Sequence, residues 1–147
     1  NTDAYNTVSP NPEGTGAAAC MRLALDDAGI SPAQVGYINA HGTATHAGDI
    51  AETKAIDEVF GKGNVFVSST KGSTGHMMGA GGIVELISCI KALETGVLPV
   101  NVGLTEQDEE CDLTIVTEEN KQQEIRVAMS NAFGFGGQNS SIIVGKA

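Results

Sequence analysis

One stretch, residues 68–90, limits what this chain can fold into more than any other part of its sequence. Its second half, residues 77–90, carries Glu85 as its only charge among apolar or small neighbours. A helix that is apolar on every side is normally buried, and an ionised carboxylate in such a helix needs a partner because removing water from a lone charge is costly. Lys71 is the nearest basic residue upstream, so we expect a buried pair of Lys71 and Glu85, with His76 beside it at the start of the helix.

A surface helix is the alternative for this stretch, with both Lys71 and Glu85 in water. Small residues favour the buried pair, because they let another segment approach the carboxylate. The neighbours of Glu85 on its own helical face are Gly81, Gly82, Ser88 and Cys89. Buried charged residues are rare and are often functional, so this pair is the first candidate for a functional site.

Composition and charge exclude several kinds of partner. A chain of 147 residues with 41% hydrophobic residues suits one compact domain over residues 1–147. A net charge of −10 argues against nucleic acid and against an anionic membrane surface. We expect neither a membrane span nor a signal peptide, because no apolar run is long enough and the first residues are polar. Three widely spaced cysteines fit reduced thiols better than a disulfide framework, and they are Cys20, Cys89 and Cys111.

Helical and strand patterns alternate along most of the chain. In chain order we predict helix 14–28, strand 35–40, helix 48–60, strand 65–67, helix 77–90, and strands 113–116, 125–129 and 140–144. This alternation predicts an α/β fold, in which helices cover a mostly parallel sheet. Short turns join the final strands, so we expect antiparallel strands at the C-terminal end of the sheet.

Polar residues follow the first two predicted strands, His41 after one and Lys71 after the other. Ligands of parallel sheets bind beyond the carboxyl ends of the strands. Two histidines, His41 and His76, that project into one pocket would supply hydrogen bonds to a developing enolate or oxyanion. A zinc site of His41, His46 and Asp49 is a competing interpretation, although no established ligand spacing is present.

Three further patterns have more than one interpretation. Residues 134–137 can aim backbone N–H groups at an anion or simply form a tight turn. Thr43 and Thr45 can bind a ligand or cap the next helix, which is the commoner role. A dinucleotide-like pattern over residues 14–19 is rejected, because no strand precedes it and no acidic residue ends the next strand.

Three segments taken together resemble a known family. They are Asn39–Thr45 (Asn-Ala-His-Gly-Thr-Ala-Thr), Ser68–His76 (Ser-Ser-Thr-Lys, then Thr-Gly-His) and Ser130–Gly137 (Ser-Asn-Ala-Phe-Gly-Phe-Gly-Gly). In this order they are similar to the C-terminal half of a β-ketoacyl-acyl-carrier-protein synthase, particularly the type II elongating condensing enzymes. The resemblance covers nearly the whole chain. It implies a thiolase-like fold of two similar α/β halves, usually assembled as a homodimer.

The resemblance also implies a reaction, the decarboxylative Claisen condensation of fatty-acid elongation. Malonyl-acyl carrier protein loses carbon dioxide, and the enolate attacks an acyl group held on a cysteine. His41 and His76 would polarise the malonyl thioester carbonyl and stabilise the enolate, Lys71 would tune the electrostatics, and Glu85 would hold Lys71. Phe135 would act as a gate at the acyl pocket, and its N–H would contribute to the oxyanion hole.

Substrate and ion contacts are implied in the same way. Thr43 and Thr45 would contact the phosphopantetheine arm, which arrives on acyl carrier protein, so the chain is expected to hold no cofactor of its own. Some relatives carry a structural monovalent cation. The resemblance implies that such an ion would lie near Asn39, Glu85, Ser130 and Asn131.

The chain departs from the family pattern in two places. The nucleophilic cysteine of the family sits in a small-residue motif in the N-terminal half, and none of the three cysteines has that setting. His46 stands where many relatives carry proline. We therefore expect a C-terminal domain that is inactive alone and has acyl carrier protein and an N-terminal half as partners.

Other readings of the same resemblance stay open. A non-catalytic subunit, such as a chain-length factor or a partner that binds acyl carrier protein, would share the fold. A thiolase is the nearest enzymatic rival, but it normally uses one histidine rather than two. We expect a cytoplasmic protein, with a plastid or a mitochondrion as alternatives.

Overall fold

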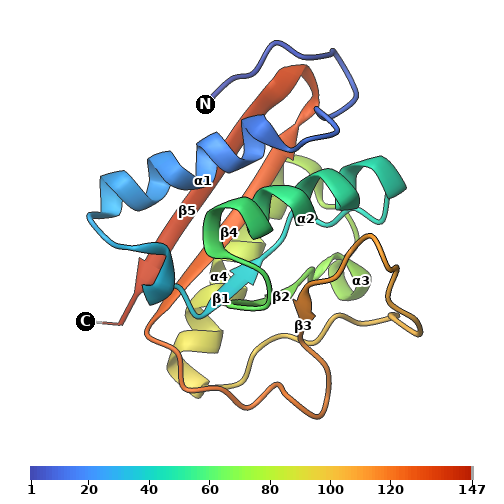
Figure 1. Ribbon diagram of the computed structural model, residues 1–147. Helices are drawn as coiled ribbons and strands as arrows, with labels where there is room; N and C mark the ends of the chain where they lie inside the picture. The colour runs from blue at the N-terminus through green and yellow to red at the C-terminus, as the bar shows by residue number, and fades with distance from the viewer. Residues whose placement is uncertain (147) are drawn as a thin grey trace.

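A computed structural model describes residues 1–146, in which helices and strands alternate (Figure 1). The elements are, in chain order, α1 (Thr15–Ala28), the 3-10 turn η1 (Pro32–Gln34), β1 (Tyr37–Asn39), α2 (His46–Phe60), β2 (Phe66–Ser68), α3 (Lys71–Thr74), the 3-10 turn η2 (Met78–Ala80), α4 (Gly81–Thr95), β3 (Thr114–Ile115), β4 (Val127–Gly134), the 3-10 turn η3 (Phe135–Gly137) and β5 (Gln138–Gly145). None of the helices in this described part of the chain is long and apolar enough to cross a membrane.

The five strands form one sheet in the order β3-β2-β1-β4-β5. The pairs β3/β2, β2/β1 and β1/β4 are parallel, and β4 pairs with β5 in the antiparallel sense. The predicted fold class, a mostly parallel sheet with antiparallel strands at its C-terminal end, is confirmed. The strand predicted over residues 113–116 lies at the opposite edge, because residues 116–126 lead back across the sheet to β4.

Helices cover both faces of the sheet, α1 and α2 on one side and α4 on the other (Figure 1). Successive side chains of a strand point to opposite faces, and the two cores divide the strand residues accordingly. The core beneath α1 and α2 includes Ala18, Met21, Leu25, Ile38, Ala55, Ile56, Val67 and Met129. The core beneath α4 includes Tyr37, Cys89, Ala92, Leu93, Leu98, Val116 and Ala128.

The long helix predicted over residues 77–90 differs in two respects. Lys71 opens the separate short helix α3 instead of lying in a loop, and α4 starts only at Gly81. Gly75, at φ +73°, ends α3 in the left-handed region of backbone space that favours glycine. The helix is also not buried on every side, because a stripe of three isoleucines lies exposed along α4. Their exposed fractions are 57% at Ile83, 50% at Ile87 and 38% at Ile90.

Candidate active site

Lys71 and Glu85 form the predicted buried pair, in which Lys71 Nζ donates to Glu85 Oε1. The two side chains are only 9% and 4% exposed. Gly81 lies one turn before Glu85, where even a Cβ would make only an ordinary contact with Oε1, at 4.0 Å. Each charge offsets the other's loss of hydration, so the pair places an ammonium group in the interior without leaving an unpaired ion.

His41 and His76 lie side by side, with ring centroids 5.8 Å apart and planes at 87°. His41 follows β1 beyond its carboxyl end, and His76 lies between α3 and η2. Burial, followed by the nearby Lys71 and His76, lowers the pKa of His41 to about 4. At neutral pH His41 is therefore an uncharged imidazole that can donate a hydrogen bond.

The orientation of His76 follows from its own hydrogen bond. Its Nδ1 accepts from the Met78 backbone N–H at 3.1 Å. A neutral imidazole has one donor and one acceptor nitrogen, so a neutral His76 carries its proton on Nε2. The free edge of the ring then presents an N–H donor, which is what an enolate oxygen requires.

Glu52, a residue that the sequence analysis did not select, holds the loop that carries His41. Its carboxylate accepts from the N–H groups of His41 and Gly42, each at 2.9 Å, and Asn131 Nδ2 lies 3.3 Å away. Burial raises the pKa of Glu52, and the three donors oppose that rise. Its position is the available signal: Glu52 lies on the buried face of α2, next to Ala51, as Glu85 does on α4.

Thr43 and Thr45 lie in the same loop, with their hydroxyl oxygens 3.2 Å apart. Thr45 occupies the residue before α2, but its side chain makes no capping hydrogen bond. The capping alternative is therefore wrong for Thr45. Both hydroxyls belong to a partly exposed loop beside His41.

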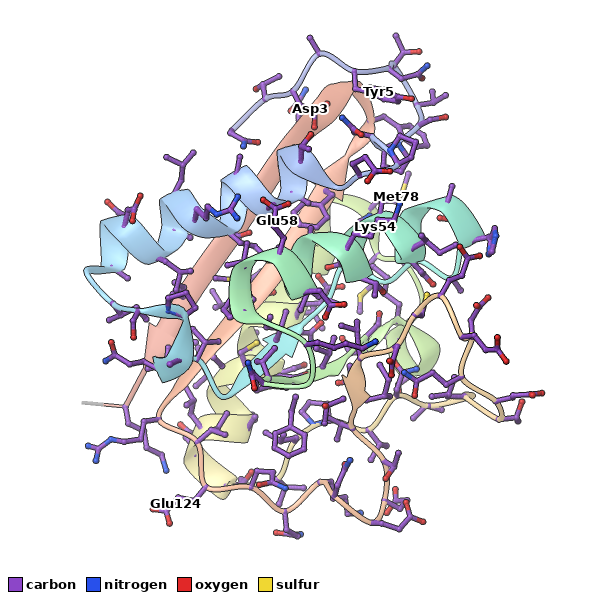
Figure 2. The ribbon with its side chains drawn as sticks, in the orientation of Figure 1. Asp3, Tyr5, Lys54, Glu58, Met78 and Glu124 are labelled. Atoms are coloured by element: carbon purple, nitrogen blue, oxygen red, sulfur yellow. The ribbon has the colours of Figure 1, made fainter. Side chains whose placement is uncertain are left out.

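Phe135 lies in η3 at the turn between β4 and β5, with 75% of its surface exposed. Gly136 and Gly137 have φ of +75° and +73°, and a side chain at Gly137 would come within 2.0 Å of the Asp3 carbonyl oxygen. The first residues of the chain hold this turn: Gly136 N–H donates to Thr7 O at 2.8 Å, and Asp3 N–H donates to Gly137 O at 2.9 Å. Figure 2 shows Asp3 and Tyr5 beside this end of the hairpin. The N–H of Gly136 is thus engaged by the protein itself.

The four residues expected near a cation do not converge. Asn39 and Ser130 are register partners on the α4 face, and Asn39 Oδ1 is buried without a hydrogen-bond partner among residues 1–146. The side chain of Asn131 lies on the opposite face, where its amide donates to Glu52 and its Oδ1 accepts from Ser141. The sheet separates this side chain from those of Asn39 and Ser130, because adjacent strand residues point to opposite faces. The monovalent-cation site stays a prediction, in which Asn131 could contribute only its backbone.

The residues of the alternative zinc site are not close together either. His41 faces His76, whereas the exposed His46 lies 3.8 Å from Asp108 and 3.9 Å from Glu110. Within residues 1–146, no group of three or more histidine, cysteine or acidic side chains is arranged to hold a metal ion.

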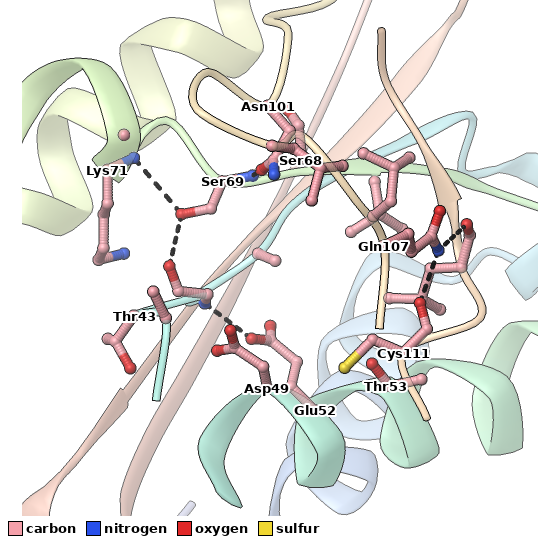
Figure 3. A pocket seen from close by; sticks show the side chains of 18 of the residues that line it. Thr43, Asp49, Glu52, Thr53, Ser68, Ser69, Lys71, Asn101, Gln107 and Cys111 are labelled. Carbon is pink, nitrogen blue, oxygen red and sulfur yellow. Dashed lines mark hydrogen bonds between the residues drawn. The ribbon is translucent and has the colours of Figure 1, made fainter. Parts of the chain in front are cut away.

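A cavity of about 430 Å³ lies behind the loop that carries His41, between α2 and residues 101–113. Lys71 and Thr43 lie at one side, and Thr53, Gln107 and Cys111 at the other (Figure 3). His76 also lines it, whereas Phe135 does not. Lys71 and His76 thus border the cavity, and the exposed Phe135 is not part of its lining.

Comparison with known protein families gives a match over residues 1–105 to the family described as "Beta-ketoacyl synthase, C-terminal domain". The "3-oxoacyl-[acyl-carrier-protein] synthase 2" of Coxiella burnetii is 44% identical over 146 residues, which are 98% of this chain and 35% of that protein. The "3-oxoacyl-[acyl-carrier-protein] synthase II, chloroplastic" of Arabidopsis thaliana is 45% identical over 143 residues, 96% of this chain and 26% of that protein.

Solved structures give the same result for the fold. "The ishigamide ketosynthase/chain length factor" superposes with a TM-score of 0.93 at 35% identity, covering 99% of this chain and 36% of that one. A complex described as "type II PKS acyl-carrier protein in complex with its ketosynthase bound to the hexaketide" gives 0.95 at 30% identity, covering 100% and 36%. The expected thiolase-like fold is confirmed, and the chain spans about a quarter to a third of the curated relatives. The chain therefore belongs to the β-ketoacyl synthase family, where it corresponds to the C-terminal part of the 3-oxoacyl-[acyl-carrier-protein] synthases.

Proposed function

We propose that this chain is the C-terminal part of an enzyme that condenses malonyl-acyl carrier protein with an enzyme-bound acyl thioester. The observation that carries the proposal is the meeting of His41 and His76 beside the buried pair of Lys71 and Glu85. These groups come from three separate segments, and they lie beyond the carboxyl ends of β1 and β2, where parallel sheets bind ligands.

In the proposed reaction the imidazoles act on the malonyl thioester. The bond between C2 and the carboxylate carbon breaks, carbon dioxide leaves, and the electron pair moves to the thioester oxygen as an enolate. Neutral N–H groups of His41 and His76 donate to that oxygen as its charge develops. The enolate carbon then attacks the acyl thioester carbonyl, a carbon–carbon bond forms, and the cysteine thiolate is expelled.

Lys71 acts on this step through the electrostatics of the site. Its ammonium lowers the pKa of His41 and thus helps to keep that imidazole neutral. Glu85 holds the ammonium in place. We therefore propose that Lys71 supplies a fixed positive charge and that Glu85 positions it, and that neither residue transfers a proton.

We infer that the nucleophile of this reaction comes from outside the described residues. Cys20 is buried in α1. Cys89 is fully buried, its thiol donates to Met129 O at 3.6 Å, and burial raises its pKa to about 12. Burial also raises the pKa of Cys111. A thiolate is the reactive form of cysteine, and neither residue has an environment that favours it.

An exposed apolar surface on α4 is a candidate interface for an N-terminal half. Ile83, Ile87 and Ile90 form an exposed apolar stripe along α4, and the relatives are about three to four times as long as this chain. We propose that an N-terminal half packs on this stripe and brings the cysteine to His41 and His76. The complete protein would be a homodimer.

Thr43 and Thr45 supply hydroxyls on the exposed loop beside His41, which suits contact with the amide groups of a phosphopantetheine arm. The partner that carries this arm would be acyl carrier protein. We propose a cytoplasmic enzyme, with a plastid as the alternative that the chloroplastic relative supports. Phe135, exposed at the other loop, would act as the gate.

The test uses the complete protein with malonyl-acyl carrier protein and an acyl-primed cysteine. Carbon dioxide release and the β-ketoacyl product are measured, the latter by mass spectrometry. His41→Ala and His76→Ala should each reduce both by about 10²–10⁴-fold, while Thr95→Ala, at the exposed end of α4, should not. A complete protein that binds acyl carrier protein but never condenses would instead be a chain-length-factor-like subunit. Condensation by the 147-residue chain alone would refute the need for an N-terminal half.

A further inference from the structure

Ser69 lies where three segments around the two imidazoles meet. Its hydroxyl donates to the Gly42 carbonyl at 2.8 Å, which belongs to the loop of His41. The same oxygen accepts from the Lys71 backbone N–H at 3.4 Å. Its own N–H donates to Asn101 Oδ1 at 2.9 Å. The side chain of Ser69 thus links the loop of His41 with the first residue of α3, and its backbone N–H ties the same residue to Asn101 in the wall of the cavity (Figure 3).

This contact extends the pairing of β1 and β2 beyond their ends. The Ala40 N–H donates to Ser68 O at 2.9 Å, which continues the backbone ladder of the two strands. Beyond that bond, the segments that follow β1 and β2 are no longer joined by backbone hydrogen bonds. The Gly42 carbonyl accepts from the hydroxyl of Ser69 instead of from a backbone N–H. The separation of the two loops is therefore set by a side chain rather than by the sheet.

Gly42 is held from both sides. Its N–H donates to Glu52 Oε2 at 2.9 Å, and its carbonyl accepts from Ser69. The contact is also close in space: a Cβ on Gly42 would lie 2.7 Å from the Ser69 Cβ, and φ at Gly42 is +34°. Glu52 anchors the loop of His41 to α2, and Ser69 anchors it toward Lys71 and His76.

We propose that Ser69 is a positioning residue, whose hydrogen bond to the Gly42 carbonyl keeps the His41 imidazole against Lys71 and His76. The proposal rests on the proposed function for its effect on the reaction, but not for its effect on the structure. Without the hydroxyl, the Gly42 carbonyl and the Lys71 N–H both lose a partner, and the loop can move toward solvent. The His41 ring then leaves the groups that face it, namely Lys71 with its partner Glu85, His76 and Phe133.

The experiment uses the complete protein with Ser69→Ala, Ser69→Thr and Ser68→Ala. Ser68 is the matched control: its hydroxyl also donates to a carbonyl, Pro99 O at 2.6 Å, and contacts Tyr37, but it bonds neither imidazole loop. Three quantities are measured for each variant: the pKa of His41 by NMR, kcat and KM for malonyl-acyl carrier protein, and the stability in urea.

Ser69→Ala should raise the pKa of His41 from about 4 toward the ordinary value near 6.5, and should lower kcat by about 5- to 20-fold with little change in KM. Ser69→Thr keeps the hydroxyl at a position that lines the cavity, so it should restore both. Ser68→Ala should lose stability without moving the pKa of His41.

An unchanged His41 pKa in Ser69→Ala would overturn the proposal, as would a loss of kcat that Ser68→Ala reproduces. If Ser69→Ala does not fold, Asn101→Ala loosens Ser69 from its other side and should raise the same pKa. No rise there would equally overturn it. A wild-type protein without decarboxylation would refute the proposed function, yet the NMR titration would still decide the role of Ser69.

Discussion

Breaking the pair of Lys71 and Glu85 should be far more costly than breaking any exposed ion pair of this chain. Lys71→Met leaves a buried carboxylate without a partner, and Glu85→Leu leaves a buried ammonium. Removing one partner of a buried pair costs about 3–5 kcal/mol, because the remaining charge has lost its hydration and gained nothing in return. The double variant replaces both charges by apolar groups of similar volume, and such replacements are often neutral.

The assay is a double-mutant cycle on the free energy of unfolding of the complete protein in urea. The two single changes sum to roughly 6–10 kcal/mol, whereas the double variant should lie within about 1 kcal/mol of the wild type. The matched control is the pair of Lys91 and Glu94 on the exposed side of α4, 2.6 Å apart and with side chains 66% and 53% exposed. Each of its single changes should cost no more than about 0.5 kcal/mol.

Stability and activity should separate in this cycle. The double variant should regain stability but not decarboxylation, because the site loses the positive charge that favours a developing enolate beside the two imidazoles. If the two single effects simply add in the double variant, Lys71 and Glu85 do not interact in the folded protein and the reasoning is refuted.

Three further perturbations test the surroundings of the site. Glu52→Ala should destabilise the complete protein by about 1–3 kcal/mol in urea, since two partly buried N–H groups lose their acceptor. The matched change on the same helix is Glu58→Ala, which removes only an exposed pair with Arg22 of α1; it should cost no more than about 1 kcal/mol, and equal losses would contradict this account. Gly137→Ala should lower the thermal midpoint more than Gly29→Ala, because both have positive φ but only a Cβ at Gly137 meets another segment, the Asp3 carbonyl; the reverse order would show that the first residues do not hold the turn. The pKa of His41 is lowered to about 4 in the folded protein. Between pH 6.5 and 4 the unfolded state therefore binds more protons than the folded state. The contribution of His41 to stability is present above pH 6.5 and is lost as the pH falls toward 4. Urea titrations should therefore show the wild type losing stability relative to His41→Gln across that window, and a constant difference would exclude the depressed pKa.

The sequence predicted the buried pair because a single charge interrupts an apolar segment, and that pattern needs no knowledge of tertiary structure. Glu52 does not show this pattern, although its neighbours on the buried face of α2 are alanines and Ile56. Its helix carries other acidic and basic residues, so its charge does not stand out in the sequence. Its partners, the N–H groups of His41 and Gly42, precede it by ten and eleven residues and become visible only when the loop folds back.

Strand residues were harder to place than helix residues. Ser130 and Asn131 are neighbours in one motif, yet the pleat of β4 sends their side chains into different cores. Which of the two faces α4 depends on the register of β4 against β1, and that register is set by contacts distant in sequence. The same limit applies to Ser69, whose partner Gly42 is 27 residues away.

The exposed stripe of Ile83, Ile87 and Ile90 shows a different limit. Hydrophobicity predicted burial for the whole helix, but periodicity cannot say which side is covered by residues of the same chain. In a chain that spans about a third of its Coxiella relative, an apolar helix face can be open here and covered in the longer protein.

The account depends on His41 and His76 acting together on one oxygen. The most direct test is malonyl-acyl carrier protein decarboxylation by the complete protein carrying His41→Gln, His76→Gln or both. The effects of groups that act as one unit are strongly non-additive. The decarboxylation rate of the double variant should therefore be within about threefold of the rate of the slower single variant. Losses that multiply in the double variant, or a single variant with wild-type rates, would contradict a shared site.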